Sequence, residues 1–177
     1  MRIDSLGALL IAALLAAAPL AAQRRRSVEV VPGQMTQVVE DTIGTPYPVR
    51  FPSGRVYRAL LAVYDDLKIP AEVRDSAAGQ VGVPSFYRRG DLAGRQISTW
   101  LGCGESMTGP NADSYRVYMY LMSTVTPDGP DASSVRSVLL AGAVNVTEGS
   151  RQPMPCESTG RLEVRIQQLL LKKLAGL

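Results

Sequence analysis

Two long segments of alternating side chains, residues 115–126 and 135–147, constrain the fold more than any other feature of the sequence. In the first, Val117, Met119 and Leu121 share one face, because successive side chains of a strand point to opposite faces. Residues 127–131 between the segments combine Pro, Asp and Gly and favour a turn. The sequence therefore predicts two long strands. Both faces of 115–126 are partly apolar, so we expect both to be covered.

Shorter patterns predict the other strands. Residues 28–31 and 35–43 are rich in Val, Thr and Ile and favour extended structure. The three prolines within residues 45–53 favour a stiff connection without regular structure. Residues 70–75 and 80–88 flank a small-residue turn and predict a β-hairpin.

Apolar residues at helical spacing predict two amphipathic helices. The first begins with Ser53 as its N-cap and ends before Pro70, which lacks the amide hydrogen that a longer helix would need. The second begins after Gly160. Its apolar stripe consists of Leu162, Ile166, Leu169, Leu170 and Leu174. Each helix should bury one face against a sheet.

The element order is strand, helix, two-stranded hairpin, two long strands and helix (β-α-β4-α). It predicts an α+β fold with one antiparallel sheet and both helices packed on one face. We expect a single domain over residues 35–177, preceded by an Arg-rich lead segment at residues 23–34. No internal repeat divides this region further.

This order resembles the helix-grip (TBP-like) group, which includes the BamC-type domains of the outer-membrane β-barrel assembly machinery. The resemblance covers roughly residues 35–175 and is one of topology, with no residue motif behind it. The chain lacks the lipidated cysteine of BamC-type proteins and has one such domain where they have two. The resemblance implies an envelope domain and, as in other helix-grip folds, a site for an apolar ligand between helix and sheet.

The N-terminal residues 1–22 have the pattern of a secretory signal peptide. Arg2 precedes a run without charge, and small residues end it. Cleavage after Ala18 and cleavage after Ala22 both fit the pattern, so the site stays open. An uncleaved membrane anchor is the alternative, because the run reaches the short limit for crossing a bilayer. We expect export to the periplasm or cell envelope.

The two cysteines, Cys103 and Cys156, agree with export. In an oxidising compartment, two thiols most simply form one disulfide. The alternative is a reactive thiol at Cys103. That alternative lacks a neighbouring cation or a histidine to lower the thiol pKa, because the chain contains no histidine and no lysine lies nearby.

The sequence also argues against most catalytic schemes. The absence of histidine excludes an imidazole base and any zinc site with a histidine ligand. No nucleotide-binding, serine-hydrolase or metalloprotease motif occurs. Asp128 and Asp131 fit a turn and offer too few ligands for calcium. We therefore expect no enzyme, no cofactor and no metal.

Charge gives little support to nucleic-acid binding. The net charge is only +3, and the basic residues are spread along the chain. The cluster Arg24, Arg25 and Arg26 is suited to peripheral contact with an anionic membrane, or forms a solvated tail. A second set combines aromatic and arginine side chains, as binding surfaces often do. Its members are Tyr87, Arg88, Arg89, Arg95 and Trp100, and the alternative is that the two aromatics belong to the core.

Two functional hypotheses remain from different classes. The first is an exported, non-catalytic binding or scaffold domain with an unidentified envelope protein or lipid as partner. The second is a carrier that holds a lipid or other apolar ligand between the sheet and the C-terminal helix. Its expected lining is Val117, Met119, Leu121, Leu162, Ile166 and Leu169. A hydrolase that works without histidine is a weaker third.

Overall fold

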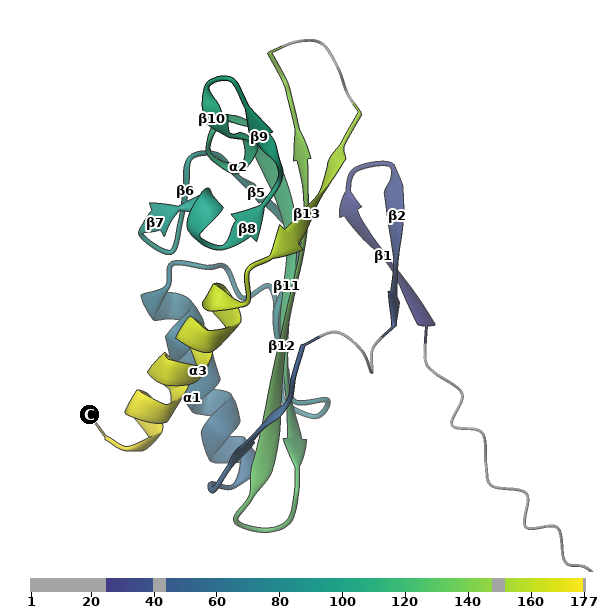
Figure 1. Ribbon diagram of the computed structural model, residues 1–177. Helices are drawn as coiled ribbons and strands as arrows, with labels where there is room; N and C mark the ends of the chain where they lie inside the picture. Colours follow the sequence, from purple (N-terminus) through teal and green to yellow (C-terminus); the bar gives the residue numbers. More distant parts are fainter. Residues whose placement is uncertain (1–24, 40–43, 148–151, 177) are drawn as a thin grey trace, which may run out of the picture.

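The computed structural model describes residues 25–39, 44–147 and 152–176, and it confirms the α+β fold. The main sheet consists of β3 (Tyr47–Val49), β4 (Val73–Asp75), β5 (Gln80–Arg88), β8 (Leu101–Gly102), β11 (Arg116–Pro127), β12 (Ser133–Val144) and β13 (Met154–Ser158). Its order is β4-β5-β11-β12-β13-β8, with β3 also paired to β12, and every pairing is antiparallel. Figure 1 views this sheet edge-on.

The helices are α1 (Ser53–Asp66), α2 (Asn111–Ser114) and α3 (Arg161–Leu174), and η1 (Ile97–Thr99) is a single 3-10 turn. The remaining strands of the described residues form three small hairpins. They are β1 (Arg25–Val31) with β2 (Gln34–Val39), β6 (Asp91–Leu92) with β7 (Arg95–Gln96), and β9 (Glu105–Ser106) with β10 (Gly109–Pro110).

The long pair predicted from the sequence is the centre of the sheet. β11 and β12 pair without interruption from Arg116 opposite Val144 to Pro127 opposite Ser133. The pair begins and ends within a few residues of the predicted limits, and β5 matches residues 80–88 as predicted. Alternate side chains of β11 are fully buried, including Val117 and Met119, because they face the helices.

Helices α1 and α3 pack on one face of the sheet, as predicted (Figure 1). Their apolar stripes fill the core together with the inner face of the sheet. The fully buried members from the helices include Val56, Leu60, Val63 and Tyr64 of α1 and Leu162, Ile166 and Leu170 of α3. The predicted N-cap Ser53 is wrong by one residue. Pro52 precedes the helix, and its carbonyl oxygen accepts hydrogen bonds from the amides of Arg55 and Val56.

The β1–β2 hairpin covers the opposite face of the sheet (Figure 1). Val28 and Val30 are buried there against Tyr120 and Leu140. Both faces of β11 are therefore covered, as its two-sided apolar pattern predicted. The hairpin spans the point at which the sequence analysis ended the lead segment and began the domain.

Two predicted features of the sheet are wrong. The strand before α1 that joins the sheet is β3, which lies within the segment 45–53 expected to be irregular. The segment expected to supply that strand, 35–43, instead contributes β2 to the outer hairpin, and residues 40–43 lie outside the described residues. The strand β13, between β12 and β8, was not predicted.

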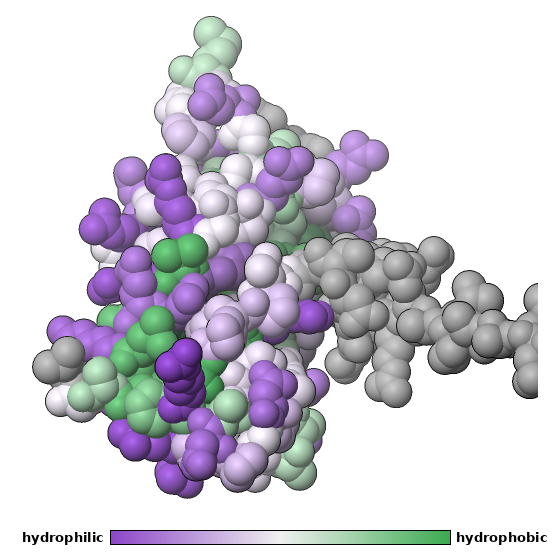
Figure 2. Space-filling model, turned by 60° about the horizontal axis from the view of Figure 1, so that its bottom comes forward, coloured by the Kyte–Doolittle hydropathy of each residue, from purple (hydrophilic) through white to green (hydrophobic). Residues whose placement is uncertain are grey.

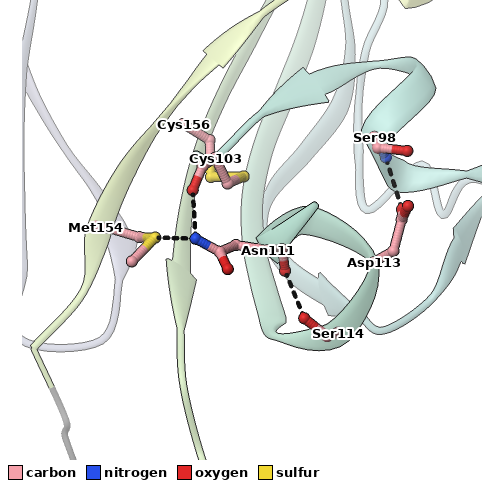
Figure 3. The surroundings of a disulfide bond; sticks show 7 residues. All are labelled: Ser98, Cys103, Asn111, Asp113, Ser114, Met154 and Cys156. Atoms are coloured by element: carbon pink, nitrogen blue, oxygen red, sulfur yellow. Dashed lines mark hydrogen bonds between the residues drawn. A yellow bond between two sulfur atoms is a disulfide. The ribbon is translucent and has the colours of Figure 1, made fainter. Parts of the chain in front are cut away.

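The disulfide between Cys103 and Cys156 is present, as predicted (Figure 3). It ties the chain after β8 to β13, across 53 positions of sequence. The buried amide of Asn111 donates a hydrogen bond to the Cys103 carbonyl oxygen (3.2 Å), and its nitrogen lies 3.6 Å from Sδ of Met154. These contacts hold the segment 89–112, which has little regular structure, against the end of the sheet.

The predicted signal peptide or anchor, residues 1–22, lies outside the described residues, as does Arg24. Arg25 and Arg26 begin β1. Among the described residues, no helix combines the length and apolar character that crossing a bilayer requires.

Candidate functional site

A groove of about 800 Å³ lies between the start of α3, the end of α1 and the tip of the β6–β7 hairpin. We call it the cationic groove. Its lining residues are Asp66, Leu67, Ala93, Gly94, Arg95, Trp100, Thr159, Gly160, Arg161, Val164, Arg165, Gln168 and Leu169. Three separate parts of the sequence thus meet at this site.

Three arginines give the groove its charge. Arg161 and Arg165 are one helical turn apart on α3, so their side chains share a face, and Arg95 comes from the opposite wall. All three are exposed. None of the three guanidinium groups has an ion-pair or hydrogen-bond partner among the described residues. The one carboxylate in the lining, Asp66, is paired with Nζ of Lys173 at 2.8 Å.

Side-chain hydrogen bonds tie the residue before α3 to the first turn of this helix. The Ser158 hydroxyl donates to Oε1 of Glu163 (2.7 Å) and accepts from the amide of Gly160 (3.1 Å). Gly160 precedes the helix with a φ of 75°, a conformation that glycine adopts without strain. The charged groups of positive sign in the lining are the three arginine side chains.

The floor of the groove is apolar and fixed. Trp100 is only 5% exposed, and its indole nitrogen donates to the carbonyl oxygen of Leu92 (2.8 Å). The Trp100 carbonyl oxygen accepts from the amide of Thr159 (2.9 Å), which joins the floor to the start of α3. A ligand in this groove would thus meet the small exposed part of Trp100, a residue that hydrogen bonds hold in place.

A second hollow, of about 610 Å³, lies beside the end of β5. We call it the edge groove, and its lining is Pro70, Glu72, Ser85, Phe86, Tyr87, Arg88 and Arg89. Tyr87 is 56% exposed, and its ring packs against Tyr118, with centroids 5.9 Å apart, and under the guanidinium of Arg116 at 5.0 Å. Arg89 donates from Nε to the carbonyl oxygen of Ser114 (3.2 Å).

The five aromatic and arginine residues singled out from the sequence are divided between these two grooves. Tyr87, Arg88 and Arg89 line the edge groove, whereas Arg95 and Trp100 line the cationic groove. The alternative that both aromatics are core residues holds for Trp100 alone, because Tyr87 is exposed.

The six residues expected to line an apolar ligand site form part of the core. Val117, Met119, Leu121, Leu162 and Ile166 are fully buried in one cluster, and Leu169 packs against that cluster. A ligand between the sheet and α3 would have to displace these side chains. Of the six, Leu169 also lines the cationic groove.

Buried hydroxyl groups gather between α1 and the sheet. The Tyr64 hydroxyl lies 3.0 Å from that of Ser123, which lies 2.7 Å from that of Ser137 on the neighbouring strand. Burial raises the pKa of Tyr64 above that of a free phenol, so it remains protonated. The recorded side-chain hydrogen bonds of this trio join its own hydroxyl groups.

Two groove residues, Arg161 and Arg165, are not among the candidate site residues of the sequence analysis. One signal pointed to them. Cations close to the start of a helix oppose its dipole, so the helix itself gains nothing from a basic residue at Arg161. Within the part of the chain that the structure describes, acidic and cysteine side chains form no cluster of three suited to a metal.

No protein-family model matches the sequence, and comparison with curated protein sequences finds no significant relative. The assignment of function therefore depends on the grooves described above.

Proposed function

We propose that this protein is an exported, non-catalytic binding domain of the cell envelope, and that its cationic groove binds an anionic group of the phosphate type. The observation that carries the proposal is the trio Arg95, Arg161 and Arg165, which line one groove without a carboxylate partner among the described residues. Guanidinium groups match the geometry of phosphate oxygens and form charge-assisted hydrogen bonds with them.

The surroundings favour a phosphate carried by a lipid over a free ion. Val164 and Leu171 of α3 are 50% and 42% exposed, and Figure 2 shows apolar side chains gathered on the helical side near the C-terminal end of the chain. Basic groups beside exposed apolar side chains suit the interface of an anionic membrane. Lipid and free phosphate share the same anionic chemistry, so the experiment has to separate them.

Export is supported by the disulfide, because disulfides persist in oxidising compartments, together with the predicted signal peptide. Expression of the full chain in a bacterial host, followed by fractionation and intact-mass measurement, tests this part. The mass of the periplasmic form should correspond to loss of residues 1–18 or 1–22. Recovery of the uncleaved chain in the cytosol with reduced cysteines would contradict export.

Trp100 offers a direct assay of the groove, because it is the single tryptophan of the chain and lines the site. Its fluorescence is recorded during titration with inorganic phosphate, with vesicles containing phosphatidylglycerol, and with neutral phosphatidylcholine vesicles. We expect saturable changes with the phosphatidylglycerol vesicles and none with the neutral ones. Saturation by inorganic phosphate alone would identify a free anion as the ligand.

The variant with Arg95→Gln, Arg161→Gln and Arg165→Gln tests the assigned residues. Removing three charged contacts should weaken binding by at least about tenfold. A single-charge control is Arg50→Gln, an exposed arginine before the start of α1, at the other end of that helix from Asp66 and Leu67. Equal binding by the triple variant and the control, or no response to either anionic probe, would refute the assignment.

A further inference from the structure

The edge groove borders a strand whose outer edge is unpaired. On the side away from β11, β5 pairs with β4 only from Gln80 to Gly82. Pro84 has no amide hydrogen with which to continue that pairing. From Ser85 to Arg88, no described strand occupies this side, and the edge groove lies there instead. The free edge is four residues long, or about 13 Å.

We propose that this edge binds an extended acidic peptide segment of a partner protein, which adds to β5 as a further strand. An unpaired edge supplies backbone donors and acceptors for such an addition, and neighbouring side chains set its specificity. The surface belongs to the sheet and is separate from the cationic groove of α3.

The charge of the edge selects the occupant. Arg88 and Arg89 line the groove, and Arg116 lies over the ring of Tyr87. The lining contains one carboxylate, that of Glu72. Arg88 donates to the carbonyl oxygen of Tyr87, its neighbour in β5, and Arg89 donates to that of Ser114. Neither guanidinium group has a carboxylate partner among the described residues. Acidic side chains that flank the peptide backbone would therefore meet preformed positive charge.

The same charges oppose pairing with a second copy of this chain. Two identical edges joined by a twofold axis would bring the arginines of one copy against those of the other. A register irregularity between Met119 and Leu121, opposite the Val83–Phe86 part of β5, also distorts the edge. Bulges, prolines and charges of this kind protect natural edges from self-association. An acidic peptide overcomes the charge barrier, whereas a second copy does not.

The test uses the full chain and a fluorescein-labelled peptide of sequence Glu-Val-Glu-Val-Glu, followed by fluorescence anisotropy. Two further peptides control the chemistry: one with Lys in place of each Glu, and one in which every backbone amide is N-methylated, so that neither edge of the peptide can donate backbone hydrogen bonds. We expect binding of the first peptide alone and slower hydrogen exchange at the amides of residues 85–89. Arg88→Glu with Arg89→Glu should weaken binding by at least about tenfold. Arg58→Glu, an exposed residue of α1, should leave it unchanged.

Ser85→Pro provides a second variant, because it removes the amide hydrogen of an exposed residue of this segment and leaves the arginines in place. It should weaken binding without shifting the melting temperature. If the N-methylated peptide binds as tightly as the unmodified peptide, charge attraction alone explains binding, and the proposal of strand addition is overturned. The absence of peptide binding would also overturn the proposal. So would protection of the amides of residues 85–89 that increases with protein concentration, because it would indicate that two copies of the chain pair at this edge.

Discussion

Removal of the Cys103–Cys156 disulfide should destabilise the protein by an amount that follows from the length of the loop it closes. For a separation of 53 residues, the chain-entropy model gives about 4 kcal/mol. Domains of this size typically unfold with about 5–15 kcal/mol in total. A loss of about 4 kcal/mol corresponds to a fall of about 8–16 °C in melting temperature for a chain of this length.

The measurement compares thermal melts of the oxidised protein, the reduced protein and the variant with Cys103→Ala and Cys156→Ala. Circular dichroism follows the whole fold, and Trp100 fluorescence follows the segment 89–112. Cys103 is buried and Cys156 partly exposed, so the variant should lose slightly more stability than the reduced protein. Reduction that lowers the melting temperature by less than about 3 °C would refute the entropy argument, because the crosslink would then constrain little.

Three further predictions concern the core and the outer hairpin. Tyr64→Phe should cost about 1 kcal/mol in urea unfolding, because the hydroxyl of Ser123 loses one of its two partners. Burial raises the pKa of Tyr64 in the folded state, so the stability it contributes is complete below the unfolded pKa of about 10 and is lost as pH rises above it. Urea midpoints at pH 8 and pH 11 should therefore differ less in Tyr64→Phe than in the wild type. Gly142→Ala would place a methyl group about 2.5 Å from a methyl carbon of Val31, so hydrogen exchange at residues 27–31 should accelerate while the amides of β11 stay protected.

The elements that could be predicted from the sequence are the helices and strands that bury one face in the core. α1, α3, β5, β11 and β12 each leave a periodic pattern, because the core requires apolar side chains at every second position or at helical spacing. The strands β3 and β13 leave no such pattern. They are three and five residues long, and each contains a proline. They are strands because β12 lies beside them, which local sequence does not reveal.

The candidate site was predicted only in part for a related reason. Arg95 and Trp100 are close in sequence, so a composition argument could find them together. Arg161 and Arg165 lie more than sixty positions further along and reach the same groove only through the packing of α3. A catalytic motif has residue types at known positions, so its distant members can be recognised in a sequence. A groove that only concentrates charge has no such fixed pattern.

The disulfide and the cationic groove are physically linked, which gives a last prediction. Arg95 lies in the β6–β7 hairpin, part of a segment with little regular structure, whereas Arg161 and Arg165 lie on a packed helix. The crosslink at Cys103 and the hydrogen bonds of Trp100 hold that segment beside α3. When both halves of a site are fixed before binding, less conformational entropy is lost as the ligand binds, so the affinity is higher.

Reduction should therefore weaken phosphatidylglycerol binding at temperatures well below the melting transition, where circular dichroism is unchanged. The effect should disappear in the Arg95→Gln single variant, because the remaining contacts come from α3 alone. If reduction weakens binding equally in that variant, the disulfide acts on α3 or on global stability and does not position Arg95. If reduction leaves wild-type binding unchanged, the other contacts of Trp100 suffice to hold the hairpin, and the crosslink serves stability only.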